Sequence, residues 1–271
     1  MRSSAPPPVG LRAAALAVAI VLAGCAGERS FRSHGSAEDA KPHVGVARAQ
    51  QLPVHGIDVS KWQGDIDWAA VAAAGTRFAY IKATEGGDVV DDRFRENWSG
   101  ARAAGIARGA YHFVYWCRPA HEQAQWFKTH IPRDPDALPP VLDAEWNGHS
   151  PTCRKRIPRE EAVAMMRTLL DELEAHTGKR PVIYTDIPFY RDVMADGSFG
   201  EYALWVRTVA AEPQEKFPGR RWHFWQYTTT GRMAGIRGNV DRNAFYGNTA
   251  AWERFARGEA MPGEVATAAL D

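Results

Sequence analysis

Short apolar runs alternate with amphipathic stretches along the chain from about residue 52 onward. The apolar runs have the length and the β-branched and aromatic content of buried strands, and we expect strands at residues 54–60, 78–84, 108–115, 138–146, 181–187, 203–209, 221–228 and 239–246. The stretches between them predict helices at residues 67–74, 94–104, 120–129, 159–177 and 249–257.

The helix predicted at residues 159–177 has the clearest signal. Pro158 precedes its first turn and Gly178 follows its last turn, which are the places where these residue types begin and end helices. Its apolar side chains recur at helical spacing, at Val163, Met166, Leu169, Leu170 and Leu173.

The order of the elements indicates a single α/β domain over residues 51–258. Helices separate the first five strands, which is the pattern of parallel βα units, whereas the last three strands have little chain between them. The sequence therefore predicts a TIM-like (β/α) barrel whose final third has lost its helices. Residues 259–271 are rich in Ala and other small residues, and we expect a disordered tail there.

The N-terminus predicts export. Arg2 and Arg12 flank the start of an apolar run over residues 11–23, which is too short to span a bilayer but suits a signal peptide. The run ends in LAGC, a string that resembles the lipobox of bacterial lipoproteins. The resemblance implies removal of residues 1–24 and lipidation of Cys25, with an ordinary signal peptide and a chance cysteine as the alternative.

The segment that follows is predicted to be a lipid-anchored flexible tether over residues 25–50, because it is polar and has almost no apolar pattern. Ala26 rather than Asp follows the cysteine, which by resemblance to lipoproteins of two-membrane bacteria favours the outer membrane. We therefore expect an exported protein, anchored by its lipid at the cell envelope and facing the periplasm.

The charge balance narrows the choice of partner. The chain has 33 basic and 32 acidic residues, so its formal charge of +1 argues against nucleic acid as a partner. A polymer would instead be bound by shape and stacking, for which ten Trp, eight Tyr and eleven Phe are available. Most of these rings are nevertheless expected in the core. We expect the protein to be a monomer.

In a barrel of parallel strands, the loops at the C-terminal ends of the strands build the one large concavity. Four acidic residues are expected at such positions: Asp58, Asp143, Glu145 and Asp241. Asp143 and Glu145 are two positions apart, so on a strand they share one face at a spacing of about 7 Å. Two such carboxyls disfavour double ionisation, which suits the acid and the charge stabiliser of glycoside hydrolysis. A solvent-facing strand edge is the alternative, but the apolar flank LPPVL and Trp146 argue against it.

Other catalytic arrangements are missing from the sequence. It contains no GxSxG elbow, no HExxH and no CxxC pair, and EGG at residues 85–87 lacks the Lys and Ser or Thr of a phosphate loop. His112 and His223 lie in apolar strands, where we expect hydrogen-bonded structural histidines rather than metal ligands. We expect no metal and no cofactor.

A series of motifs follows between residues 55 and 247: HGIDVSKWQGDIDW, FAYIKATEG, GAYHFVY, LPPVLDAE, PVIYTD, LW, WQYT and GNVDRNAFYG. In this order they resemble glycoside hydrolase family 25, a family of lysozymes. The resemblance implies a (β/α)5β3 barrel that cleaves the β-1,4 bond between N-acetylmuramic acid and N-acetylglucosamine in the glycan strands of peptidoglycan.

The same resemblance implies roles for single residues. Glu145 matches the proton donor and Asp143 its electrostatic partner, which orients the substrate acetamido group or stabilises charge. Asp58 and Asp241 match the remaining acids of the cleft. Aromatic positions expected to line the cleft are Tyr111, Tyr184 and Trp225.

One departure from the family pattern concerns the sixth strand. Family members often continue LW with Ile-Ala and an aromatic residue, whereas this chain has Arg207 and Thr208 a few positions on. Arg207 is therefore a candidate to meet the lactyl or peptide carboxylate of a cell-wall substrate.

The sequence leaves alternatives open. A barrel that binds peptidoglycan without cutting it, and a chitinase-like hydrolase, both fit the pattern less well than a muramidase. A spacing near 7 Å fits an inverting pair and also substrate-assisted retention, and likeness to other D-x-E hydrolases of acetamido sugars favours retention.

Besides Cys25, the cysteines are Cys117 and Cys153, which follow the adjacent third and fourth predicted strands. Loops after neighbouring strands share one rim of a barrel, and an exported protein folds in an oxidising compartment. We therefore expect a disulfide between them, with two unpaired thiols as the alternative.

Overall fold

The computed structural model describes Met1 and residues 44–259. The expected signal peptide, the lipidation site Cys25, most of the expected tether and the tail from residue 260 onward lie outside the described residues. Within the described part of the chain, no helix is long and apolar enough to cross a membrane.

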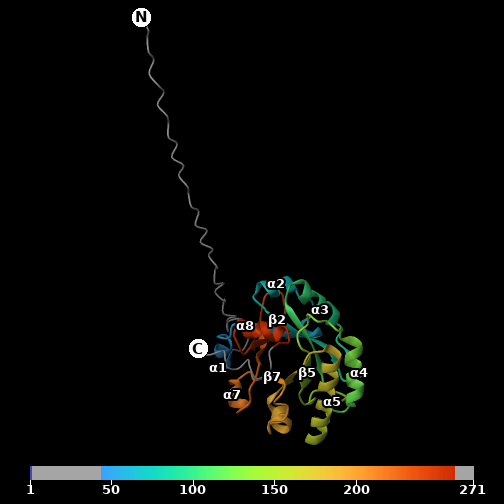
Figure 1. The fold of residues 1–271 in the computed structure, drawn as a ribbon. Coiled ribbons are helices and arrows are strands. Elements are labelled where there is room, and N and C mark those ends of the chain that lie inside the picture. The colour runs from blue at the N-terminus through green and yellow to red at the C-terminus, as the bar shows by residue number, and fades with distance from the viewer. Residues whose placement is uncertain (2–43, 260–271) are drawn as a thin grey trace. The chain divides into compact units, whose positions relative to one another are not determined.

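The strands form one closed mixed barrel (Figure 1). Their bounds are β1 Val54–Val59, β2 Phe78–Glu85, β3 Val89–Val90, β4 Ala107–Phe113, β5 Val141–Ala144, β6 Val182–Thr185, β7 Ala203–Arg207, β8 Phe224–Gly231 and β9 Val240–Phe245. The sheet order is β1-β9-β8-β7-β6-β5-β4-β2-β3, and pairing of β1 with β2 closes it. Strand β3 is a short hairpin partner of β2, so eight strands make the barrel wall. The predicted irregular TIM-like barrel is confirmed.

The last strand does not run parallel to the others, although the prediction for the four acids assumed that all strands of the barrel are parallel. Strands β1, β2 and β4 to β8 run parallel in the wall, but β9 is antiparallel to both β8 and β1. Asp241 therefore lies near the start of its strand and not at its C-terminal end. It still reaches the same rim, because it pairs directly with Asp58 in the β1–β9 ladder.

The helices lie outside the barrel, and α3, α4 and α5 follow one another along one side of it (Figure 1). Their bounds are α1 Val44–Ala49, α2 Trp68–Ala73, α3 Phe94–Ala103, α4 Ala120–His130, α5 Arg159–Thr177, α6 Ile187–Phe189, α7 Pro213–Lys216 and α8 Thr249–Ala256, with a 3-10 helix η2 at Lys61–Gln63 and a π-helix η3 at Tyr190–Met194. Helix α5 has the predicted bounds, and Gly178 ends it in the left-handed conformation at φ 71°.

Helix α1 lies inside the stretch that was predicted to be tether, so that boundary was wrong. Its last residue, Ala49, is fully buried in the main apolar core. Ordered helical structure is therefore present ahead of Leu52, where we had expected folding to begin. A helix of six residues has too few turns to show helical periodicity in the sequence.

The inside of the barrel is packed with rings below its mouth. Phe78 contacts Trp252 of α8 at 5.0 Å between ring centroids, and Tyr80 contacts Trp205 at 5.1 Å. Phe224 packs on both Phe78 and Tyr80. These rings close this end of the barrel, and Trp252 of α8 packs on them.

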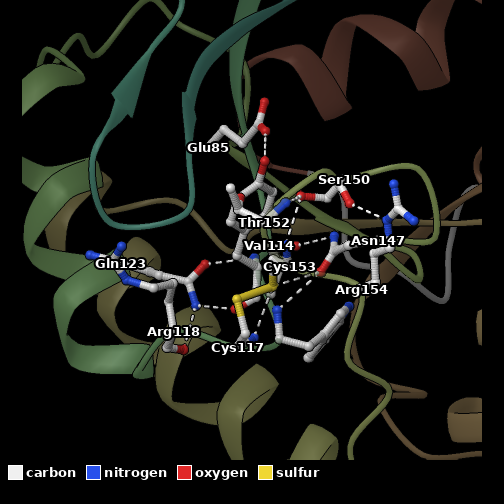
Figure 2. Close-up of a disulfide and its surroundings, with 12 residues drawn as sticks. Glu85, Val114, Cys117, Arg118, Gln123, Asn147, Ser150, Thr152, Cys153 and Arg154 are labelled. Carbon is white, nitrogen blue, oxygen red and sulfur yellow. Dashed lines mark hydrogen bonds between the residues drawn. A yellow bond between two sulfur atoms is a disulfide. The ribbon is translucent and has the colours of Figure 1, made fainter.

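A disulfide joins Cys117 and Cys153, as predicted, with their Cα atoms 5.6 Å apart (Figure 2). It connects the loop after β4 with the loop between β5 and α5. The Cys153 amide donates to Ser150 Oγ at 3.0 Å, so the second loop is also folded on itself. Both loops belong to the mouth of the barrel.

Candidate active site

The mouth of the barrel holds a cavity of about 230 Å³. All four predicted acids line it: Asp58, Asp143, Glu145 and Asp241. They meet there because alternate residues of each strand point inward, and each acid stands in the inward series of its own strand. The register then sets the neighbours, since Asp143 of β5 pairs with Tyr184 of β6.

Asp58 is held by amide side chains. Its Oδ2 accepts hydrogen bonds from Gln226 Nε2 at 2.9 Å and from Asn243 Nδ2 at 2.7 Å. Burial raises the pKa of Asp58, while these two donors and Asp241 act against that rise. For Asp241, burial and the adjacent Asp58 raise the pKa well above the ordinary value. Within this pair, the amide donors favour the ionised form of Asp58, and the adjacent Asp58 favours the protonated form of Asp241.

The two amides are themselves fixed by aromatic side chains. Gln226 Oε1 accepts a hydrogen bond from the Tyr184 hydroxyl at 3.0 Å, and Asn243 Oδ1 accepts one from Trp205 Nε1 at 2.8 Å. This network leaves the Asp58 side chain little freedom to rotate. It is a preorganised carboxylate at the base of the cavity.

One oxygen of Asp143 has no hydrogen-bond partner within the described part of the chain. Its Oδ1 is buried and accepts no hydrogen bond from any of residues 44–259. Burial, and then the charge of Glu145, raise the pKa of Asp143 well above its ordinary value. A buried acceptor in this state is costly, and a ligand that brings a donor would relieve the cost.

Glu145 titrates near neutrality. Burial, and then the nearby charge of Asp186, raise its pKa to about 7, against the opposing charges of Arg207 and Lys82. The carboxyl is thus protonated in a large part of the molecules at neutral pH, while its side chain still lines an open cavity. These are the properties of a general acid.

Lys82 brings a cation into the cavity. It forms an ion pair with Glu85, which also accepts a hydrogen bond from the Tyr115 hydroxyl. Burial acts to raise the pKa of Glu85, but Lys82 and Tyr115 outweigh it, and the pKa is lowered. Lys82 was not among the predicted site residues, although it alternates with Phe78 and Tyr80 along the second predicted strand and so belongs to the inward series.

The predicted cleft aromatics are only partly confirmed in position. Tyr111 and Tyr184 line the cavity, but Trp225 does not. Trp225 lies between the inward residues Phe224 and Gln226, so its ring points outward, where its Nε1 donates to the Thr208 carbonyl at 2.8 Å. Naming Trp225 as a cleft residue was therefore wrong.

Two other tryptophans take the place expected for Trp225. Trp205 lines the cavity from β7, and Trp62 lines it from η2 with 81% of its surface exposed. A capping box holds η2, since the Ser60 amide donates to Gln63 Oε1 at 2.9 Å. Trp62 comes directly after the first predicted strand, and that position could have marked it.

Arg207 lies at the end of β7, two residues beyond Trp205, and is partly buried. Burial acts to lower its pKa, but the acids around it, among them Glu145 and Asp241, contribute to an opposing effect that outweighs burial, and the pKa is raised. Thr208 turns away from the cavity and donates to the Ala211 carbonyl at 2.9 Å.

The two strand histidines are structural, as expected. His112 Nδ1 lies 2.8 Å from Thr84 Oγ1 and its Nε2 lies 3.2 Å from Gln123 Oε1, and burial lowers its pKa to about 4. His223 Nδ1 accepts from the Leu204 amide at 3.3 Å. Residues 44–259 contain no cluster of three or more His, Cys, Asp or Glu that could hold a metal ion.

Comparison with known proteins agrees with this geometry. The family model described as glycosyl hydrolases family 25 matches residues 57–236. Lysozyme M1 of Streptomyces globisporus is 39% identical over 221 residues, which cover 76% of this chain and 72% of the relative.

Two solved structures are similar along the barrel. A bacterial lysozyme from Streptomyces coelicolor has 37% identity and a TM-score of 0.67, and the match covers 76% of this chain and 98% of that one. A family 25 glycosyl hydrolase from Bacillus anthracis has 32% identity and a TM-score of 0.69, with 76% and 94% covered. The chain with this carboxyl-lined barrel therefore belongs to family 25 of the glycosyl hydrolases.

Proposed function

We propose that this chain is a peptidoglycan muramidase, which hydrolyses the β-1,4 bond between N-acetylmuramic acid and N-acetylglucosamine with Glu145 as the general acid. The observation that carries the proposal is the Glu145 carboxyl, which lines the open cavity and has its pKa raised to about 7. Relatives named lysozyme and N,O-diacetylmuramidase support the substrate class.

In the first step, Glu145 gives its proton to the glycosidic oxygen while the bond from that oxygen to the anomeric carbon breaks. Positive charge then grows on the sugar ring. Asp58 is the carboxylate that stabilises this charge, because its amide donors favour its ionised form and hold it in place. Asp241 beside it holds a proton and keeps the pair from carrying two charges.

Asp143 orients the nucleophile, which is the carbonyl oxygen of the substrate's own acetamido group. The buried Asp143 Oδ1 accepts the acetamido N–H, and a donor at that oxygen favours the charged form of the carboxyl. The carbonyl oxygen bonds to the anomeric carbon and forms a cyclic oxazolinium ion. Water then opens this ring at the anomeric carbon and gives its proton to Glu145, with net retention.

Aromatic and basic side chains bind the strand. Trp62 and Tyr111 offer rings on which sugar faces pack, and Tyr184 is held by its bond to Gln226 beside the reacting sugar. Arg207 supplies a positive charge at the rim for the lactyl group or a peptide carboxylate of the substrate.

The test is to incubate the purified protein with peptidoglycan and to identify the released fragments by mass spectrometry. We expect fragments that end in reducing N-acetylmuramic acid, and a Glu145→Gln variant that releases them at least about 100-fold more slowly with unchanged binding to the wall. Comparable release from chitin would favour the chitinase-like alternative. Binding of the wild-type protein without any release would favour the non-catalytic alternative.

We also propose that the protein is exported and anchored through a lipid on Cys25 at the outer membrane, facing the periplasm. The LAGC string supports this, and so does the disulfide, because such bonds persist in oxidising compartments. Metabolic labelling with a radioactive fatty acid should mark the wild-type chain and not Cys25→Ser. A Cys25→Ser chain that is still processed normally and stays in the membrane fraction would contradict the proposal.

A further inference from the structure

The loop between β5 and α5 carries three consecutive basic residues, Arg154, Lys155 and Arg156, and all three are exposed. The same loop begins at the end of β5, beside Glu145. A basic segment so close to the reacting centre has no part in the chemistry proposed above.

The loop is held rigidly beside the site. Cys153, directly before the basic residues, is bonded to Cys117, and the Arg154 guanidinium donates from Nε to the Ser150 carbonyl at 2.7 Å (Figure 2). At the start of the loop, Asn147 Nδ2 donates to the Val114 carbonyl at 2.7 Å. The basic segment is therefore a fixed part of the rim.

Arg156 connects this segment to the cavity. Its guanidinium lies 5.4 Å from the ring centre of Trp146, the residue after Glu145, and pairs with Asp192 at 3.1 Å. Its charge also acts on Asp186, and Asp186 is the charged group that most raises the pKa of Glu145. The last residue of the basic segment is thus linked to Glu145 through Trp146 and Asp186.

Arg154 and Lys155 differ from Arg156 because neither pairs with a carboxylate among residues 44–259. On the rim that carries Trp62, by contrast, the exposed acids Asp65 and Asp92 are paired with Arg93 at 2.7 Å and with Lys61 at 3.9 Å. Among the described residues, the charges of Arg154 and Lys155 are therefore available to a ligand at the mouth of the barrel.

We infer that Arg154 and Lys155 bind the carboxylates of the peptide that hangs from the substrate's N-acetylmuramic acid, and so select glycan strands that still carry these peptides. This inference rests on the proposed muramidase function. A glycan that fills the cavity leaves its peptide to exit over the rim, where the exposed charges of Arg154 and Lys155 attract the carboxylates of the peptide.

The test compares two substrates, intact glycan strands and the same strands from which an amidase has removed the peptides. For the wild-type protein, kcat/KM should be higher on the peptide-bearing strands, and the preference should weaken as salt is added. In Arg154→Gln/Lys155→Gln the ratio of the two kcat/KM values should fall about fivefold, the scale of two exposed charge contacts. A matched control is Arg95→Gln/Arg102→Gln, which removes two exposed charges from α3 and should keep the wild-type ratio.

An unchanged ratio in Arg154→Gln/Lys155→Gln would overturn the inference. An equal loss on both substrates would overturn it as well, because the loop would then contact the glycan itself. Failure of the muramidase proposal looks different, since the wild-type protein would then cleave neither substrate. Thermal unfolding of each variant shows whether the fold is intact before the ratios are compared.

Discussion

The floor and the mouth of the barrel are built by the same strands and have opposite character. In β2, Tyr80 belongs to the floor and Lys82, two positions on, belongs to the mouth. In β8, Phe224 and Gln226 are related in the same way. The floor residues are fully buried rings in contact with other rings. The mouth residues are polar groups around an open cavity.

The difference is energetic as well as chemical. Apolar burial in the floor stabilises the fold, whereas the mouth buries carboxyls whose pKa values are raised by that burial. Such acids bind more protons in the folded than in the unfolded chain, so their contribution to stability falls as pH rises from about 4 toward the raised pKa values. The floor thus offsets the cost of a site prepared for catalysis.

The largest expected effect on stability is at the floor. Phe224→Ala removes a fully buried ring that contacts several others, and it should lower the free energy of unfolding by about 3–5 kcal/mol. Urea denaturation measures this. Trp62→Ala removes an exposed ring at the mouth and should change stability by less than about 0.5 kcal/mol. Equal losses in the two variants would remove the distinction between floor and mouth.

The disulfide gives the mouth a source of stability that does not depend on burial. It closes a segment with a sequence separation of 36, so Cys117→Ser/Cys153→Ser should lose about 3–4 kcal/mol. Wild-type protein unfolded in the presence of a reductant should show a similar loss. A double variant as stable as the oxidised wild type would mean that the loops hold one another without the bond.

Removal of a buried carboxyl at the mouth should raise the stability of the fold instead of lowering it. Asp143→Asn removes a buried acid with a raised pKa, so at pH 7 the variant should be about 1 kcal/mol more stable than the wild type, although its turnover falls. The gain should disappear below about pH 4, where the acid is protonated in both folded and unfolded chains. Melting temperature against pH measures it, with the exposed Asp136→Asn as control. A loss of stability at pH 7 would refute this account of the mouth.

The smallest expected effect is a shift in the pH profile. Glu145 sets the alkaline limb near its pKa of about 7, and the Lys82 charge acts to lower that pKa. Lys82→Gln should therefore move the alkaline limb to higher pH, by less than about one unit. The pH dependence of kcat/KM measures the shift, and Lys216→Gln on α7 is a control that removes an exposed charge. A limb that moves to lower pH would show that Lys82 does not act on Glu145 through its charge.

Much of the fold was predictable because its signals are local. The strand and helix order, the bounds of α5 and its end at Gly178 all follow from periodicity and from the conformational preferences of single residues. The spacing of Asp143 and Glu145 likewise implies a shared face on any strand. The pairing of Cys117 with Cys153 could be predicted because they are the two cysteines of the barrel domain.

Two predictions were wrong at places where the local sequence is compatible with two structures. Strand β8 is buried on both faces and has a large ring on each of them, so its composition does not reveal which residues point inward, and Trp225 was assigned to the wrong face. The direction of β9 was undetermined for a similar reason, since a strand reads the same whether its neighbour is parallel or antiparallel. Only the closure of the barrel decides both.

By itself, therefore, the sequence determined which chemical groups are available and which strand or loop carries each of them. The tertiary structure alone decided their surroundings: the amide donors of Asp58 from strands β8 and β9, the unpaired oxygen of Asp143, and the burial that raises the pKa of Glu145. The physical reason is that a carboxyl's pKa and hydrogen bonds depend on groups that are near in space but far along the chain, and Asp58 and Asn243 are separated by 185 positions.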